Sequence, residues 1–287
     1  MTDYRHKSKH QPRIYAHRGT TLLAPENTQP AFDLALEHGA DVLETDVRLS
    51  ADGHVIVTHD ADVKRTTDGN GQVRGLTLAA LKELDAGYRA RSLDQQTFAG
   101  QGIELITLDE LFELYPDVAV NIDIKDKQPE AAQAVADCIN RHQRQHNTTV
   151  GSFHSALLLD FRRYAPAIRT AAVRHEVVRL YFSRLALPRG GIGTLTKRSG
   201  DDQTDSGGRE TARSEFSALQ IPVRYKMIPL ATRRFIERIS AQGLEICYWT
   251  INDPAQMRQL LLRGAHGIVT DRPDLAETVF RELGLRG

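Results

Sequence analysis

Short apolar runs alternate with helical stretches along almost the whole chain, and this alternation restricts the fold more than any other sequence feature. Eight of these runs are typical of β-strands, and most are followed by a segment with helical periodicity. A crossover of a dozen or more residues makes successive strands parallel. Eight βα units in 287 residues therefore predict a (β/α)8 TIM barrel. The predicted strands are residues 14–17, 42–47, 118–124, 149–153, 170–173, 217–221, 245–250 and 266–270.

The segment 42–60 places two carboxylates and a histidine on a strand and a turn. Side chains two apart on a strand point to the same face, so Glu44 and Asp46 project together. Strands disfavour acidic residues, and a pair on one face repels unless a cation lies between the two carboxylates. The Asp-Gly pair at 52–53 predicts a two-residue hairpin turn, so residues 54–58 are expected to return antiparallel, outside the barrel.

Composition excludes several classes of function. The chain has 37 Lys and Arg against 37 Asp and Glu, so no net field attracts nucleic acid or an anionic membrane. Cys138 and Cys247 are its only cysteines, which favours a reducing compartment over a disulfide framework. Residues 1–13 contain no apolar run and predict a flexible tail rather than a signal peptide or an anchor. We therefore expect a cytoplasmic protein.

One domain, residues 14–287, is expected to hold the whole barrel. Residues 61–108 are too irregular for a barrel strand and too long for a simple loop, which predicts an insertion beside the active face. Residues 189–215 are rich in Gly, Ser, Thr and charged groups, and predict a mobile loop. Residues 177–187 are apolar with interspersed arginine, so they form either an ordinary barrel helix or a surface that touches a membrane transiently.

The C-terminal ends of the predicted strands carry the candidate functional groups, as expected for this fold. The acids there offer only oxygen, and no cysteine or histidine pair has zinc-like spacing, which favours Mg²⁺ or Ca²⁺. Arg18 and Lys125 suit a bound anion, and His17 and His59 can exchange protons near neutral pH. The residues at or just beyond these strand ends are His17, Glu44, Asp46, Asp123, Lys125 and Trp249.

Nine short motifs, in order, give the chain a family resemblance between about residues 14 and 280. They are HRG at 17–19, PEN at 25–27, ETD at 44–46, DG at 52–53, HD at 59–60, NIDIK at 121–125, SF at 152–153, WTIN at 249–252 and GIVTD at 267–271. Through them the chain closely resembles the glycerophosphodiester phosphodiesterase family of TIM barrels. One departure is Asp123, which stands where that family usually has Glu.

The resemblance implies a role for each matched residue. The implied roles are Glu44, Asp46 and Asp123 as ligands of Mg²⁺ or Ca²⁺, with Mn²⁺ as a third option, His17 and His59 as the acid–base pair, Arg18 and Lys125 on the phosphate, and Glu26 and Asn27 as supporting residues. Glu26 could bind either Arg18 or the metal. Trp249 could either fill the barrel mouth or face the substrate.

The implied reaction is metal-dependent hydrolysis of a glycerophosphodiester to sn-glycerol 3-phosphate and an alcohol. Two alternatives remain: a lysophospholipase D that releases lysophosphatidic acid, and a catalytically silent barrel that only binds phosphodiesters. The expected partner is a small glycerophosphodiester or a lysophospholipid, and no nucleic acid. The order of the two histidines, the attacking group, which is water or the neighbouring glycerol hydroxyl, and the oligomeric state stay open.

Overall fold

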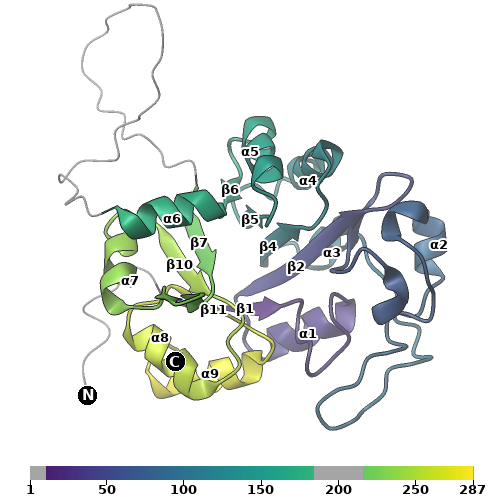
Figure 1. The fold of residues 1–287 in the computed structure, drawn as a ribbon. Helices are drawn as coiled ribbons and strands as arrows, with labels where there is room; N and C mark the ends of the chain where they lie inside the picture. Colours follow the sequence, from purple (N-terminus) through teal and green to yellow (C-terminus); the bar gives the residue numbers. More distant parts are fainter. Residues whose placement is uncertain (1–10, 184–215, 287) are drawn as a thin grey trace, which may run out of the picture.

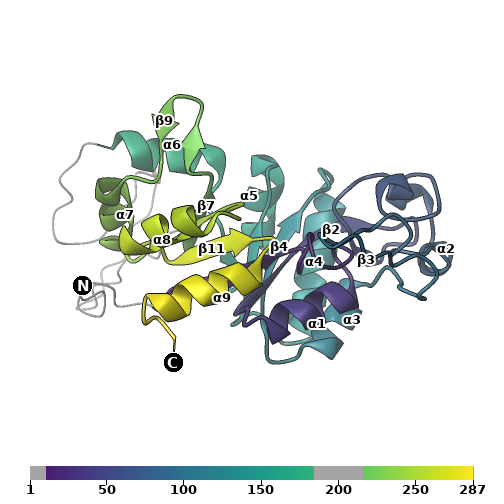
Figure 2. The ribbon, with the colours of Figure 1, turned by 90° about the horizontal axis from the view of Figure 1, so that it is seen from below.

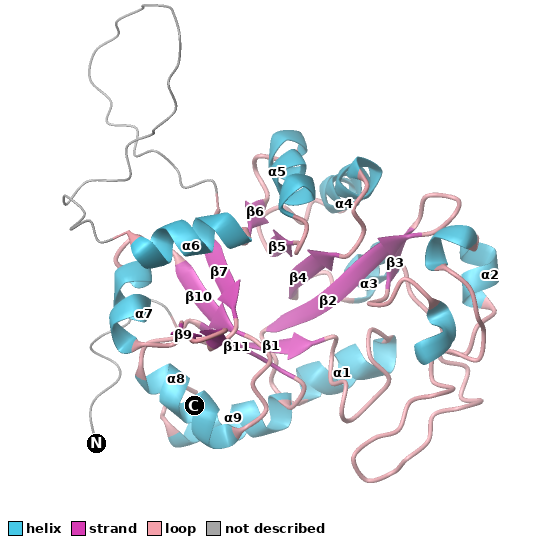
Figure 3. Ribbon diagram, viewed as in Figure 1, coloured by secondary structure: helices cyan, strands magenta, loops and turns pink. Residues whose placement is uncertain are grey.

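A computed structural model describes residues 11–183 and 216–286, in which a ring of strands is surrounded by helices (Figure 1). The ring strands are β1 (Arg13–His17), β2 (Val42–Leu49), β4 (Ala119–Ile124), β5 (Thr148–Gly151), β6 (Arg169–Thr170), β7 (Ala218–Ile221), β10 (Glu245–Tyr248) and β11 (Gly267–Thr270). The helices between and after them are α1 (Gln29–Glu37), α3 (Leu108–Leu114), α4 (Pro129–Arg141), α5 (Ser155–Tyr164), α6 (Arg174–Phe182), α7 (Arg233–Ser240), α8 (Pro254–Leu262) and α9 (Pro273–Glu282) (Figure 3).

All eight ring strands are parallel, in the order β6-β5-β4-β2-β1-β11-β10-β7. The two ends of this order meet through a parallel bridge between Ala171 and Ala218. A hydrogen bond from the backbone N–H of Ala172 to the carbonyl of Ala218 (2.7 Å) joins the same edges. The predicted TIM barrel and its eight strands are confirmed. Within the described part of the chain, no helix has the length and apolar character that crossing a bilayer requires.

Local sequence signals explain where the first helices begin and end. Pro30 lies in the first turn of α1, where its missing N–H costs nothing, and Gly39 follows the helix with φ of +80°. Helix α3 begins with a capping box, in which the Thr107 hydroxyl accepts from the N–H of Glu110 and the Glu110 carboxylate accepts from the N–H of Thr107. The start of each helix therefore follows from a local sequence signal.

The return strand β3 (Val55–Val57) pairs antiparallel with β2, as predicted. The predicted two-residue turn between them is wrong, because residues 50–54 connect the strands. The Asp52 carboxylate accepts hydrogen bonds from the Ser50 hydroxyl (2.6 Å) and from the N–H of Leu78 (3.0 Å). The bond to Leu78 attaches the turn to helix α2 (Leu78–Lys82), while backbone bonds from Gly53 N–H to Ser50 O (3.2 Å) and from Ser50 N–H to His54 O (2.9 Å) close it.

Residues 61–108 lie on one side of the barrel and contain α2 and the 3-10 helices η2 (Val63–Arg65) and η3 (Val73–Gly75) (Figure 2). They share a small apolar cluster of their own with Ile56 of β3. Its buried members are Ile56, Val63, Val73, Leu81, Ala86, Phe98, Ile103 and Leu105. This segment is therefore held by a core distinct from the larger clusters under the barrel helices.

A hairpin that no sequence pattern predicts, β8 (Arg224–Tyr225) and β9 (Ile228–Pro229), lies beside α6 on the opposite side of the barrel (Figure 2). Of the predicted flexible tail, Gln11 donates to the carbonyl of Leu285 (3.1 Å) and Arg13 already belongs to β1. Residues 1–10 of that tail and the predicted mobile loop 189–215 lie outside the described residues.

Candidate active site

A cavity of about 600 Å³ opens at the C-terminal ends of the barrel strands. Most of the predicted site residues lie on its wall: His17, Arg18, Glu44, Asp46, His59, Asp123, Lys125 and Trp249. Glu26 and Asn27 are not on the wall and contact the residues that are. The structure thus brings the whole predicted set into one place.

Strand register explains why the acids converge. Asp46 of β2 pairs with Asp123 of β4, and Glu44 of β2 pairs with His17 of β1. Residues in register on neighbouring parallel strands point the same way, so these side chains share one face. Thr45 points to the other face, where its hydroxyl donates to the side-chain oxygen of Asn27 (2.8 Å).

The three carboxylates differ in how their charges are balanced. Burial, together with the charge of Asp46, raises the pKa of Glu44 to about 7. Burial would also raise the pKa of Asp46, but Lys125 Nζ at 2.8 Å and Arg18 Nε at 2.9 Å lower it below its ordinary value. Burial raises the pKa of Asp123 even though Lys125 Nζ lies 2.6 Å from its Oδ2 atom. Three carboxylates thus face two cations, Arg18 and Lys125, so the negative charge of the site is not fully neutralised.

The donor set fits a hard divalent cation. Asp123 Oδ1 is buried and has no hydrogen-bond partner among the described residues, so it is an oxygen available to an ion. Glu44, Asp46 and Asp123 supply only oxygen atoms, which Mg²⁺ and Ca²⁺ prefer. Lys125 Nζ bridges Asp46 and Asp123, and the three carboxylates are spread more widely than a compact ligand cluster.

A different group of ligand-type side chains is compact but lies elsewhere. Asp109 of α3 and Cys138 and His142 at α4 have donor atoms within 4.8 Å of one another. Arg141 already forms an ion pair with Asp109 at 2.5 Å, and burial raises the pKa of the Cys138 thiol well above its ordinary value. This group is an ion-paired contact between two outer helices, away from the cavity.

His17 is held by the carboxylate of Asp271, a residue that was not among the predicted site residues. Its Nδ1 atom lies 2.6 Å from Asp271 Oδ1, and Asp271 also accepts from the Thr21 hydroxyl (2.6 Å) and the Asn252 amide (2.7 Å). Burial alone would lower the pKa of His17, but the Asp271 hydrogen bond and the charge of Glu44 raise it. The ring therefore has a fixed orientation toward the cavity.

Arg18 and Gly19 form a tight turn in which both residues have a left-handed backbone conformation. Arg18 has a φ of 51°, and its backbone N–H donates to Glu44 Oε2 (3.1 Å). Its guanidinium reaches Glu26 Oε1 (3.0 Å) and Asp46 Oδ2 (2.9 Å). Gly19 follows with φ of +84°, and a Cβ there would lie 2.7 Å from the Cβ of Ala31, so only glycine fits this position.

His59 belongs to a chain of charges that reaches back to Arg18. Its Nδ1 atom lies 2.6 Å from Asp60 Oδ1, and Arg65 of η2 binds the other Asp60 oxygen. Arg65 also makes two bonds of 2.7 Å to the Glu26 carboxylate. Burial alone would raise the pKa of Asp60, but Arg65 and His59 lower it to about 2. Arg65 thus joins the surroundings of His59 to those of Arg18.

The Glu26 carboxylate is shared by Arg18 and Arg65, which hold its pKa below the ordinary value although burial opposes them. Trp249 is half-buried on the cavity wall, and its ring meets that of Phe153 edge to face at 5.9 Å. Lys125 Nζ lies 5.3 Å above the same Phe153 ring.

Beyond Trp249 the cavity wall becomes mainly apolar. Its apolar members on or next to α6, β7 and the β8–β9 hairpin are Val177, Val178, Tyr181, Phe182, Ile221, Tyr225, Ile228 and Leu230. Arg174 of α6 and Gln220 of β7 are the polar side chains on these elements that line the cavity. Asp60, Asp271 and Asn252 fall within the HD, GIVTD and WTIN motifs, so the sequence carried a signal for them. Arg65 carried none, because it lies in the irregular segment and outside every motif.

Comparisons with known proteins agree with this geometry. The model of the glycerophosphoryl diester phosphodiesterase family matches residues 17–275. A glycerophosphodiester phosphodiesterase of Caldanaerobacter subterraneus subsp. tengcongensis is 31% identical over 276 residues, which cover 94% of this chain and 98% of that protein. The mouse protein named lysophospholipase D GDPD1 is 24% identical over 289 residues, which cover 94% and 86% of the two chains.

A crystal structure of a glycerophosphodiester phosphodiesterase from Agrobacterium tumefaciens superimposes with a TM-score of 0.70 at 28% identity. The superposition covers 94% of this chain and 99% of that one. Fold and sequence are thus similar to the same group of proteins over nearly their whole lengths. The chain therefore belongs to the glycerophosphoryl diester phosphodiesterase family and is a phosphoric diester hydrolase.

Proposed function

We propose that the enzyme hydrolyses glycerophosphodiesters to sn-glycerol 3-phosphate and an alcohol with the help of a divalent cation. The observation that carries this proposal is the arrangement at the strand ends. Two histidines, each hydrogen-bonded through Nδ1 to a carboxylate, open onto the cavity that also holds Glu44, Asp46 and Asp123. The relatives that bear this activity in their names support the same substrate class.

Glu44, Asp46 and Asp123 are the proposed ligands, and Mg²⁺ or Ca²⁺, with Mn²⁺ as a third option, is the proposed ion. When bound, such an ion supplies positive charge to a phosphoryl oxygen. Arg18 and Lys125 line the same wall, where a guanidinium and an ammonium can hold the remaining oxygens of the phosphodiester. Glu26 and Asn27 support this set through Arg18 and Asp46, respectively.

His17 and His59 are the proposed proton carriers. Asp271 and Asp60 bind Nδ1 of the two rings, which leaves the Nε2 atoms for the substrate. One ring takes the proton from the attacking hydroxyl and the other returns a proton to the leaving alcohol oxygen. The attacking group is water, which gives the products in one step, or the neighbouring glycerol hydroxyl, which expels the alcohol and leaves a cyclic phosphodiester that water must then open. The same two histidines can move the protons in each of these steps.

The test is release of glycerol 3-phosphate from glycerophosphocholine by the purified enzyme. We expect release with a divalent ion present, loss after EDTA, and recovery when Mg²⁺, Ca²⁺ or Mn²⁺ is restored. His17→Ala should lack the activity while its thermal unfolding stays close to that of the parent protein. Release that persists after complete chelation would contradict the metal proposal, and no release with any ion would favour a barrel that only binds phosphodiesters.

The apolar part of the cavity wall favours a second candidate activity, that of a lysophospholipase D. An acylated substrate would place its chain against α6 and the hairpin while its phosphate occupies the charged part. The similarity to the mouse lysophospholipase D supports this candidate. The two activities are separated by measuring lysophosphatidic acid formed from lysophosphatidylcholine beside turnover of glycerophosphocholine. If the acylated substrate gives only background release while glycerophosphocholine is turned over, the lysophospholipase D activity is excluded.

We further propose that the enzyme works in a reducing compartment such as the cytoplasm. Cys138 and Cys247 are both buried free thiols. Burial raises the pKa of Cys247 to about 12, so this thiol stays protonated and unreactive at neutral pH. Full activity in excess dithiothreitol is the expected result.

A further inference from the structure

The rim of the cavity formed by α6 and the β8–β9 hairpin combines exposed apolar side chains with cations. We propose that this rim is a docking surface for an anionic phospholipid bilayer, on which the enzyme lies with its cavity facing the lipid. The proposal rests on the proposed function, because it explains how the site would reach phosphodiesters held in or near a membrane.

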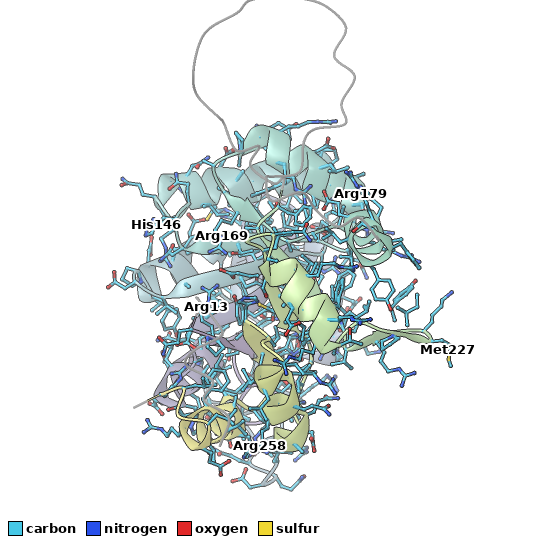
Figure 4. The ribbon with its side chains drawn as sticks, turned by 90° about the vertical axis from the view of Figure 1, so that its left-hand side faces the viewer. Arg13, His146, Arg169, Arg179, Met227 and Arg258 are labelled. Carbon is cyan, nitrogen blue, oxygen red and sulfur yellow. The ribbon has the colours of Figure 1, made fainter. Side chains whose placement is uncertain are left out.

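The apolar component is concentrated in one place. Met227, at the tip of the hairpin, is 83% exposed, and Phe182, at the end of α6, is 63% exposed. Val178 and Tyr225 are exposed beside them. The hairpin that bears Met227 projects from the molecule on the side where Arg179 also lies (Figure 4). Other exposed large apolar side chains of the described residues are spread over separate elements, such as Leu114 on α3 and Leu262 on α8.

The charge of the same surface has one sign. Arg174 and Arg179 are exposed on α6, and Arg224 and Lys226 are exposed on the hairpin. The only acid in these two elements is Glu176, which is buried and bound by Arg162 at 2.7 Å. Since the whole chain balances 37 basic against 37 acidic residues, this is a local departure from neutrality.

A surface with both properties matches the interface of an anionic bilayer. Basic side chains bind anionic headgroups, while neighbouring apolar side chains enter the boundary between headgroups and acyl chains. The surface is also continuous with the active site, because Val178, Phe182 and Tyr225 line the cavity as well. Lipid that touches the rim would therefore meet the cavity directly, with the exposed Arg174 at the boundary between the two.

A second copy of the chain is a poorer occupant for this surface. In a two-fold symmetric dimer the same patch meets itself, so the cations of one copy would face those of the other. Like charges facing each other across an interface oppose association. A bilayer that carries negative charge has the opposite effect, and its attraction to this rim should weaken as salt is added.

The experiment is sedimentation of the full chain with vesicles of phosphatidylcholine alone or mixed with phosphatidylglycerol. We expect binding to the mixed vesicles, weakened by salt, and little binding to phosphatidylcholine alone. Met227→Ser and Lys226→Gln should each lower partitioning into mixed vesicles by about fivefold. Neither residue lines the cavity, so glycerophosphocholine hydrolysis should stay unchanged in both variants.

Leu262→Ser and Arg74→Gln are the matched controls, since both residues are exposed and lie on other elements. Equal losses in controls and rim variants would overturn the proposal, as would no vesicle binding by a protein that still hydrolyses glycerophosphocholine. A concentration-dependent dimer that Met227→Ser abolishes would assign the rim to a second copy instead. Vesicle binding without hydrolysis by the parent protein would contradict the proposed function alone.

Discussion

The two walls of the cavity are built on opposite physical rules. The wall on β1, β2 and β4 is a network of charges in which His17, Arg18, Asp46, Asp123 and Lys125 form ion pairs. Glu44 belongs to the same wall and accepts a hydrogen bond from the backbone N–H of Arg18. The wall on α6, β7 and the hairpin is mainly apolar, with Arg174 and Gln220 as polar members, and its contribution depends on buried area rather than on the direction of contacts. A charged wall fixes geometry, because an ion pair loses its value when a partner moves or is removed. An apolar wall tolerates variation, since its contribution changes gradually with buried surface.

This difference predicts that the charged wall governs turnover of every substrate, whereas the apolar wall governs choice between substrates. Changes in the first should lower activity on glycerophosphocholine and lysophosphatidylcholine together. Changes in the apolar wall should alter activity on lysophosphatidylcholine while leaving activity on glycerophosphocholine unchanged. The largest effect is expected for the proposed acid–base pair, and the smallest is a shift in pH dependence.

His17→Ala should cause the largest loss, about 10²–10⁴-fold in kcat for any substrate that the enzyme turns over, because one of the two proton transfers is no longer assisted. Steady-state kinetics on both substrates measure it. His146→Ala is the control, since that histidine is exposed and is not on the cavity wall (Figure 4). A loss confined to one substrate would contradict the idea that the charged wall governs turnover of every substrate.

Arg65→Ala should lower kcat by about 10–100-fold, although Arg65 does not line the cavity. The change removes the cation shared by Asp60 and Glu26, so the partner of His59 and the partner of Arg18 lose their common anchor. Lys64→Ala, on the same 3-10 helix, should retain parental kinetics. Arg65→Lys should recover part of the loss, because lysine restores the charge without the two-pronged contact. Unchanged kinetics in Arg65→Ala would show that this bridge is only structural.

Phe182→Ser tests the apolar wall. If acylated substrates are turned over, we expect about a tenfold fall in kcat/KM for lysophosphatidylcholine, from the loss of one large apolar contact, and little change for glycerophosphocholine. Leu114→Ser, an exposed apolar residue on α3, serves as control. Equal falls for both substrates would mean that α6 supports the site as a whole rather than selecting the substrate.

Asp271→Asn should produce the smallest effect and the most informative one. The Asp271 carboxylate helps to raise the pKa of His17, so the amide should lower that pKa. If His17 is the base, the acidic limb of the pH–rate profile moves to lower pH; if it is the acid, the alkaline limb moves to lower pH. The limb that moves assigns the proton roles, and a movement to higher pH would contradict the electrostatic argument.

The sequence was sufficient for the barrel because periodicity is a local property. Runs such as Val118 to Ile124 and the helices between them alternate without ambiguity, and the strand count places His17, Glu44 and Asp123 at one end of the ring. It was insufficient where contacts depend on irregular segments. Asp52 binds the backbone N–H of Leu78, 26 positions along the chain, which no two-residue pattern encodes.

Contacts that sequence periodicity cannot indicate support both walls of the cavity. Arg65 reaches Glu26 across 39 positions of the chain from a segment without periodicity, so nothing in its surroundings indicated the contact. The hairpin around Met227 has strands of two residues each, too short for alternation to appear. Long-range ion pairs and very short strands are set by tertiary structure, and they emerge only when the barrel is assembled.

The separate core of the segment 61–108 bears on how the enzyme should respond to heat. That cluster has eight buried apolar residues, whereas the cluster under α3, α4 and α5 has 29. Small cores open at lower free energy than large ones, so this segment should melt locally while the barrel is still folded. Because Arg65 melts with it, activity should disappear reversibly several degrees below the transition that circular dichroism records for the barrel, and cooling should restore it.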